Sequence, residues 1–151
     1  MSEIKITEVT SNFKDVAELV GNLLTELDPN TKPNTYELKD IARSLLETNK
    51  MWAFIAKFEE QNIGVITMHE CAAIYAGGIF GEISELYVIP EYRSANVGEL
   101  LVKSAICKGN QLGWNRLEVG TPPPDESPRT LNFYKNKGFQ LTGARLKLVL
   151  N

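Results

Sequence analysis

Apolar and polar residues alternate over 4–9 (IKITEV), which predicts a strand near the start of the chain. Apolar residues then recur at helical spacing over 13–27, and a second apolar stripe of the same period begins at about Thr35. The turn residues DPNTKPN (28–34) separate the two predicted helices, and Asn34 is placed to cap the second. Two helices therefore follow the first strand before the chain returns to strand patterns.

The middle of the chain has the pattern of an antiparallel meander. MWAFIAKF (51–58) and IGVITMHECAAIYA (63–76) flank a short polar turn and predict a hairpin with a long second strand. Two glycines at 77–78 turn the chain again, into a third apolar segment at 79–89. We expect these three strands to pair in sequence order.

The last third of the chain returns to mixed elements. Apolar spacing predicts a helix from Val97 to Gly113, then a strand over 115–121. The run PPPDE (122–126) predicts a stiff, extended linker, and Ser127 followed by proline predicts a short helix through Lys137. The final stretch, 139–150, is expected to supply one or two more strands. No repeat or composition break divides the chain, so residues 1–151 are expected to form one domain.

Composition narrows the classes of partner. The chain of 151 residues is 43% hydrophobic and 23% charged, with a formal net charge of −3, which argues against nucleic acid and anionic membrane surfaces. Its start has no signal-peptide pattern, and no apolar run is long enough for a membrane span. Cys71, Cys107 and the single His69 have no metal-site spacing, so we expect no metal and a reducing, cytoplasmic setting.

The stretch PEYRSANVGELL (90–101) carries the clearest chemical signal. The first N–H groups of a helix lack intrahelical partners, and with the helix dipole they attract anions, phosphate above all. Side chains near this turn are small, and Arg93 adds a permanent positive charge. Asn96 tolerates the positive φ that a phosphate-binding loop often requires. The stretch is either such a loop or an ordinary strand-to-helix turn.

Two motifs resemble those of the GNAT N-acetyltransferase superfamily. ELYVIPEYRSANVGELLVKSAI (85–106) resembles the family's acetyl-CoA-binding motif, Arg/Gln-x-x-Gly-x-Gly/Ala; Arg93 and Gly98 match its first and last positions, while Asn96 replaces the middle glycine. SPRTLNFYKNKGFQLTG (127–143) resembles the motif in which a Tyr-bearing helix ends in Gly-Phe. The predicted order of elements follows the family over essentially the whole chain.

The resemblance implies an α/β (α+β) fold with a mixed, mostly antiparallel sheet of six to seven strands. About four helices would flank the sheet, and a V-shaped splay between strands 4 and 5 would hold acetyl-CoA. In such a fold, backbone N–H groups of 94–98 would bind the pyrophosphate and backbone of 87–89 would pair with the pantetheine arm. The cofactor-binding residues implied in this way are Tyr87, Val88, Ile89, Arg93, Ser94, Ala95, Asn96, Val97, Gly98, Glu99, Asn132 and Tyr134.

Glu82 and Glu85 are the candidates for a catalytic base. A primary amine of pKa about 10.4 is neutral in only about one molecule per thousand at pH 7, a deficit of roughly 4 kcal/mol that a carboxylate can help to overcome. Glu82 matches the catalytic glutamate of some histone acetyltransferases of the superfamily, and Glu85 matches an acidic position of its small-molecule members. Their spacing of three places them on opposite faces of an ideal strand, so we expect only one at the cleft, or both as solvated strand residues.

Tyr134 holds the position of the family's usual general acid. A phenol of pKa about 10 stays protonated at pH 7 and can donate to a departing thiolate; the alternative role is that of a core aromatic beside Phe133 and Phe139. The 28–34 connection and Tyr36 would border the acceptor pocket in this family.

These observations predict an acetyl-CoA-dependent N-acetyltransferase that transfers the acetyl group directly to a primary amine of a small molecule. No base is evident beside either cysteine, which favours direct transfer over an acyl-enzyme. The alternatives are a non-catalytic CoA-binding sensor or partner domain of the same fold, and a protein or peptide N-acetyltransferase. A homodimer is also expected, with the C-terminal ARLKLVL (144–150) as a contact to a neighbouring copy.

Overall fold

The computed structural model describes residues 2–121 and 127–150, so the linker expected at 122–126 lies outside the described residues. Within them the chain forms one five-stranded sheet of order β1-β2-β3-β4-β5. The strands are β1 (Ile4–Glu8), β2 (Met51–Phe58), β3 (Gln61–Ala73), β4 (Gly78–Val88) and β5 (Leu117–Val119). The helices are α1 (Phe13–Leu27), α2 (Thr35–Leu46), α3 (Val97–Leu112) and α4 (Pro128–Lys135), with a 3₁₀ turn, η1 (Pro90–Tyr92), before α3.

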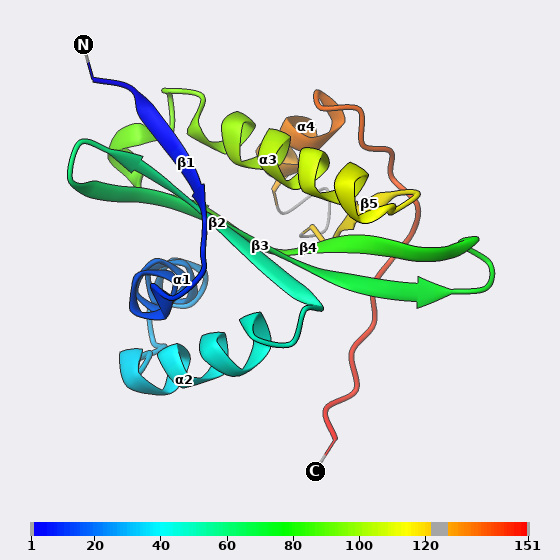
Figure 1. Ribbon diagram of the computed structural model, residues 1–151, viewed down its shortest axis with the longest axis horizontal. Helices are drawn as coiled ribbons and strands as arrows, with labels where there is room; N and C mark the ends of the chain where they lie inside the picture. The colour runs from blue at the N-terminus through cyan, green and yellow to red at the C-terminus, as the bar shows by residue number, and fades with distance from the viewer. Residues whose placement is uncertain (1, 122–126, 151) are drawn as a thin grey trace.

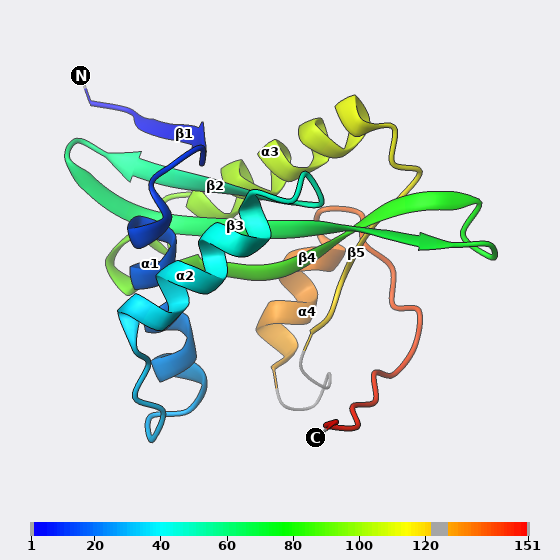
Figure 2. The same cartoon turned by 60° about the horizontal axis from the view of Figure 1, so that its bottom comes forward.

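The architecture is mixed α/β, as predicted. Neighbouring strands are antiparallel except β4 and β5, which are parallel. Helices α1 and α2 lie on one face of the sheet and α3 lies on the other (Figures 1 and 2). Helix α4 follows β5 and contacts the first turn of α3 through Phe133. No helix in the described part of the chain is long and apolar enough to cross a membrane.

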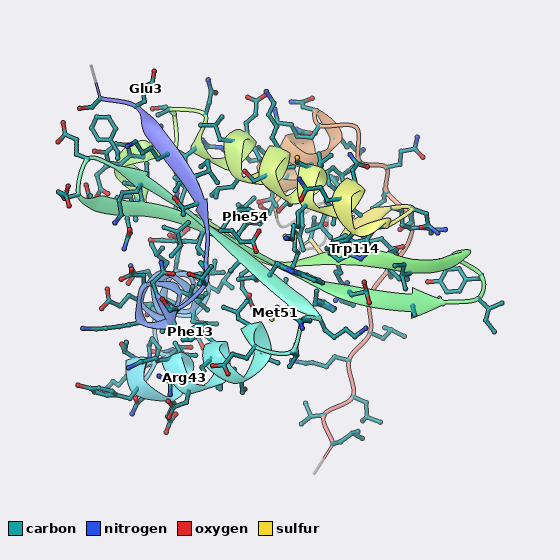
Figure 3. The ribbon with its side chains drawn as sticks, in the orientation of Figure 1. Glu3, Phe13, Arg43, Met51, Phe54 and Trp114 are labelled. Atoms are coloured by element: carbon teal, nitrogen blue, oxygen red, sulfur yellow. The ribbon has the colours of Figure 1, made fainter. Side chains whose placement is uncertain are left out.

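The central strand β3 is covered on both faces, which explains its unbroken apolar run. On the α1 side, Phe13 points into the core, and the guanidinium of Arg43 from α2 lies 5.8 Å from its ring centroid (Figure 3). Asn34 caps α2 as predicted, because its side-chain oxygen accepts from the N–H groups of Tyr36 and Glu37 at 2.9 and 3.1 Å. The largest fully buried side chains come from β3 and α3: Ile63, Val65, Ile66, Thr67, Met68, Val97, Leu101 and Val102.

Trp114, directly after α3, joins that helix to the sheet. Its ring lies over Gly81 of β4, where a Cβ would stand only 2.1 Å from the nearest ring carbon. Its indole N–H donates to Glu70 at 3.0 Å, and its ring meets that of Trp52 edge-on at 5.5 Å. These contacts hold the end of α3 against the ribbon in which β3 and β4 extend beyond their neighbours (Figures 1 and 3).

The strands predicted over 139–150 are wrong for the described residues, and the sheet therefore has fewer strands than the six to seven expected. The segment runs as an extended chain without backbone hydrogen bonds to the sheet (Figure 1, red). A strand pattern needs an edge to pair with, and β5 offers only three residues. Leu146 and Leu148 are consequently 96% and 84% exposed. Helix α4 also ends at Lys135, before the predicted Lys137.

Candidate active site

A β-bulge in β4 determines which side chains face the cleft. Thr67 of β3 is opposite Glu85 and Met68 is opposite Ile83, so Ser84 is one extra residue in β4. The extra residue shifts the alternation of side chains by one position. Glu82 and Glu85 therefore lie on the same face of the sheet, and the expectation of opposite faces is wrong.

This acidic face carries the side chains of Thr67, His69, Glu82, Glu85 and, on β5, Glu118, because directly opposite residues of paired strands share a face. The buried Thr67 hydroxyl donates to the Glu85 carboxylate and accepts from the Glu85 N–H at 3.0 Å. His69 Nδ1 and the hydroxyl of Ser84 share a hydrogen bond of 2.7 Å. Thr67 thus fixes Glu85 at the bulge, and Ser84 fixes His69. Neither Thr67 nor Ser84 was identified as a site residue from the sequence.

Glu82 is held by a residue far away in sequence. Nη2 of Arg145, from the C-terminal segment, donates to both carboxylate oxygens of Glu82, at 2.7 and 3.0 Å. The Glu82 side chain is 15% exposed, and this hydrogen bond raises the pKa of Arg145. No local sequence signal links the two residues, because the contact depends on where the segment lies.

The sheet splays immediately after this pair. Pairing between β4 and β5 ends at Ile83 and Val119, while β4 continues to Val88, so the described residues provide no strand partner for the end of β4 on that side. The N–H of Ile89 donates to Ile63 in β3 at 2.9 Å, so the backbone groups of Val88 point to the opposite edge. This free edge matches the predicted V between the fourth and fifth strands and suits an extended ligand that hydrogen-bonds to a strand.

The loop after β4 has the geometry of an anion site. Asn96 has φ 62° and ψ 21°, which confirms the positive φ inferred for it, and α3 begins at the next residue. Within the described part of the chain, no hydrogen-bond acceptor is found for five loop and first-turn N–H groups, those of Ser94, Asn96, Val97, Gly98 and Glu99. These donors, at the positive end of a long helix, fit a pyrophosphate.

Arg93 was expected to offer a free positive charge at this loop, and its guanidinium is instead paired within the protein. Arg93 donates from Nε to the Val88 carbonyl at 2.8 Å and pairs with Glu26 of α1 at 2.5 Å, so its guanidinium is already engaged. The hydrogen bond to Glu26 also raises the pKa of Arg93. Lys137, which the sequence did not suggest, lies at the first turn of α3, with Nζ 3.3 Å from Glu99.

Tyr134 lies on α4, 6% exposed, between the rings of Phe133 and Phe139. Burial raises the pKa of its phenol to about 12, so the hydroxyl is a proton donor throughout the neutral range. It lines a cavity of about 790 Å³ enclosed by β5, α4 and the C-terminal segment, and Arg145 is part of the same lining. Asn132, on the same helix, is exposed.

The thiol of Cys71 is poorly suited to nucleophilic attack. Burial, followed by the charge of Glu82, raises the pKa of Cys71, which keeps this group protonated; Cys107 is exposed on α3. No cluster of His, Cys, Asp and Glu able to hold a metal ion occurs among residues 2–121 and 127–150.

Comparison with known proteins agrees with this geometry. The family model for the acetyltransferase (GNAT) domain matches residues 47–141. No curated protein matches the chain in sequence.

Solved structures share the fold at low identity. One is the aminoglycoside N-acetyltransferase AAC(6')-Iy in complex with CoA, with 16% identity, a TM-score of 0.81, and 99% of this chain and 96% of that chain covered. Another is a transcriptional regulator from Bacillus halodurans C-125, with 16% identity, a TM-score of 0.83 and coverage of 98% and 100%. A third is a ribosomal-protein-alanine N-acetyltransferase from Brucella melitensis biovar Abortus 2308, with 17% identity, a TM-score of 0.75 and coverage of 98% and 99%.

Proposed function

Because the chain belongs to the acetyltransferase (GNAT) domain family, an acyltransferase family that uses acetyl-CoA, we propose that it acetylates a primary amine of a small molecule by direct transfer. The observation that carries the proposal is the arrangement along β4. This strand presents two carboxylates on one face and then leads, within a few residues, to a free edge and a loop of unpartnered N–H groups.

The residues present fit acetyl-CoA. The N–H groups of Ser94 and of 96–99 would hold the pyrophosphate, and the edge of β4 that faces away from β3, up to the Val88 N–H, would pair with the pantetheine arm. The backbone of Ile89 is engaged by Ile63 and Tyr92, and the Val88 carbonyl accepts from Arg93. Arg93 would act indirectly, by fixing Val88 and the loop to α1, while Lys137 adds a cation beside the first turn of α3. The bound cofactor supplies the acetyl thioester and leaves with its sulfur as a thiol.

Glu82 and Glu85 supply the negative charge that attracts the ammonium form of the acceptor, and one of them removes its proton, directly or through water. The hydroxyl of Thr67 fixes the Glu85 carboxylate toward this face. Glu82 is less free, because Arg145 occupies both of its oxygens. We propose both carboxylates as catalytic, without assigning the proton transfer to one of them.

Tyr134 is proposed as the general acid. A phenol with a pKa of about 12 remains protonated at neutral pH and donates to the developing thiolate. Two contacts support its place beside the cofactor loop: the ring of Phe133 lies against Gly98, and Lys137 reaches Glu99. Asn132 is exposed on the same helix and is kept as a candidate for the pantetheine arm.

We also propose a homodimer in a reducing, cytoplasmic setting. Leu146, Leu148 and Leu150 are 96%, 84% and 83% exposed on a segment with strand patterning, which supports pairing with a second copy. The free thiols of Cys71 and Cys107 support the reducing compartment.

Calorimetric titration with acetyl-CoA tests the cofactor first. Micromolar binding is expected, followed by release of free thiol when a panel of small polyamines, aminoglycosides, amino acids and N-terminal peptides is added. Acetylation of small amines supports the proposal, and acetylation of peptides alone would replace it with a protein N-acetyltransferase. Binding without thiol release from any amine would favour a CoA sensor, and no heat with an unchanged melting temperature would remove the cofactor site.

A further inference from the structure

A single side chain connects the C-terminal segment to the sheet. Among the described residues, the pair between Arg145 and Glu82 is the one hydrogen-bonded link between 140–150 and the rest of the chain. The residues on either side of Arg145 are exposed, including Leu146 and Leu148. The segment is therefore positioned by an ion pair rather than by strand pairing or by burial of its leucines.

The guanidinium of Arg145 packs closely against the chain at this position. It lies on the backbone of Gly120, where a Cβ would stand 2.9 Å from Cζ, 3.0 Å from Nε and 3.1 Å from Nη2. A Cβ at position 120 would therefore force the guanidinium to shift. Arg145 and Gly120 also line the cavity that contains Tyr134, so the cation lies within the candidate site.

We propose that Arg145 is a tethered competitor of the acceptor, whose guanidinium occupies Glu82 until the ammonium of the acceptor replaces it. The inference rests on the proposed function, since it takes Glu82 as a carboxylate that meets the acceptor amine. Both cations seek the same two oxygens, and an occupied Glu82 neither attracts an amine nor accepts its proton. Acceptor binding thus releases the segment and opens one wall of the cavity.

The contact has the properties that such an exchange needs. The Arg145 side chain is 65% exposed, so water can solvate it when it leaves, whereas Glu82 is only 15% exposed and needs a cationic partner. Exposed ion pairs are worth little net free energy, and a ligand with several positive charges can compete with one. Selectivity follows: a neutral amine or an anionic acceptor cannot displace Arg145, and a polycation can.

Calorimetric titration with spermidine, in low salt and without acetyl-CoA, tests the competition directly. Removing the competitor in Arg145→Gln should tighten spermidine binding about two- to fivefold relative to wild type. Lys147→Gln is the matched control, because it removes the same charge from the same segment two residues away. Arg145→Lys should bind like wild type. Arg145→Gln binding no tighter than Lys147→Gln, or no spermidine binding by any variant, would overturn the inference.

Two further variants test whether the effect passes through Glu82. Gly120→Ala keeps every charge but crowds the guanidinium, so it should tighten binding in the same direction as Arg145→Gln and by less. In a Glu82→Gln background, Arg145→Gln should act no more strongly than Lys147→Gln; an undiminished effect there would mean general electrostatics and would overturn the inference. Spermidine binding does not require acetyl transfer, so this inference and the proposed function can fail separately.

Discussion

The ring of Phe133 lies against Gly98, so closely that a Cβ on this glycine would stand 3.3 Å from the ring. Phe133 precedes Tyr134 on α4, and Gly98 is in the first turn of α3, beside the loop of free N–H groups. This contact, with the ion pair between Lys137 and Glu99, joins the proposed general acid to the proposed pyrophosphate site. A displacement of the loop should also displace Tyr134.

Replacing Tyr134 with phenylalanine removes the proton donor and keeps the ring. We expect kcat for acetyl transfer to fall about 10²-fold, with little change in the KM for acetyl-CoA, because the loss affects the departing thiolate. Steady-state kinetics with the best amine of the panel would measure both. Tyr75→Phe, at an exposed position on the β3–β4 ribbon, is the control. An unchanged kcat in Tyr134→Phe would leave Tyr134 only a core role.

The same phenol should make stability depend on alkaline pH. Burial raises the pKa of Tyr134 to about 12, against about 10 in the unfolded chain, so the native state holds the proton more tightly. The stabilisation is complete below pH 10 and is lost as pH rises from 10 toward 12, at up to about 1.4 kcal/mol per pH unit. Urea unfolding at pH 9, 10 and 11 should show a steeper fall in wild type and Tyr75→Phe than in Tyr134→Phe. An equal fall of unfolding free energy with pH in all three proteins would contradict a raised pKa for Tyr134.

Substituting the two carboxylates tests their share in deprotonating the acceptor. We expect Glu82→Gln and Glu85→Gln each to lower kcat/KM for the amine, and the double variant to lower it further, by about 10²-fold or more. Without a base only amine that is already neutral reacts, so the rate of the double variant should rise about tenfold per pH unit up to the pKa of the amine, near 10. Glu91→Gln is a control in the 3₁₀ turn. If the two single variants and the double variant all keep the wild-type pH–rate profile, both residues are excluded as the base.

Asn96 is expected to tolerate glycine and not alanine. At φ 62° a Cβ is strained, by about 1 to 2 kcal/mol for residues other than Gly and Asn. Asn96→Gly should therefore keep its melting temperature and bind acetyl-CoA at least as tightly as wild type, while Asn96→Ala should lose stability and affinity together. Calorimetry and thermal unfolding would measure the two effects. Tighter binding by the alanine variant would mean that the loop does not need this conformation.

Gly81 is expected to be a stability position. A methyl group there would stand 2.1 Å from the ring of Trp114, which is confined by Glu70 and Trp52. Gly81→Ala should cost about 1–3 kcal/mol of unfolding free energy, seen as a lower denaturation midpoint. Gly109→Ala, whose Cβ would approach the same ring only to 3.0 Å, should cost less. Equal losses in the two variants would mean that the ring moves freely.

Local patterns predicted most elements of the fold. Apolar periodicity located the first three helices and the meander, and the Ser-Pro pair at 127–128 located the fourth helix. The tolerance of asparagine for positive φ predicted the conformation of Asn96. Each of these depends on interactions within a few residues or on one buried face. The alternation over 139–150 is also a genuine strand pattern, but pairing needs an edge that the three-residue β5 does not provide.

The candidate site was harder to predict, because two of its determinants are not local. Counting residues assigned Glu82 and Glu85 to opposite faces, and the bulge at Ser84 reversed this; a bulge appears in the register of two strands, not in the sequence of one. Arg145 lies 63 residues from Glu82 in the chain, and only the path of the segment brings them together.

The extra residue in β4 also affects how the acidic face can change in the course of evolution. Deleting the codon for Ser84 would leave Glu82 and Glu85 two residues apart in a regular strand, so both carboxylates would stay on the acidic face and the Ser84 hydroxyl would be lost. The bulge can therefore absorb the loss of one residue from β4 without exchanging the side chains on this face. In descendants of this chain, loss of one residue at the bulge would change this face less than a substitution of either carboxylate.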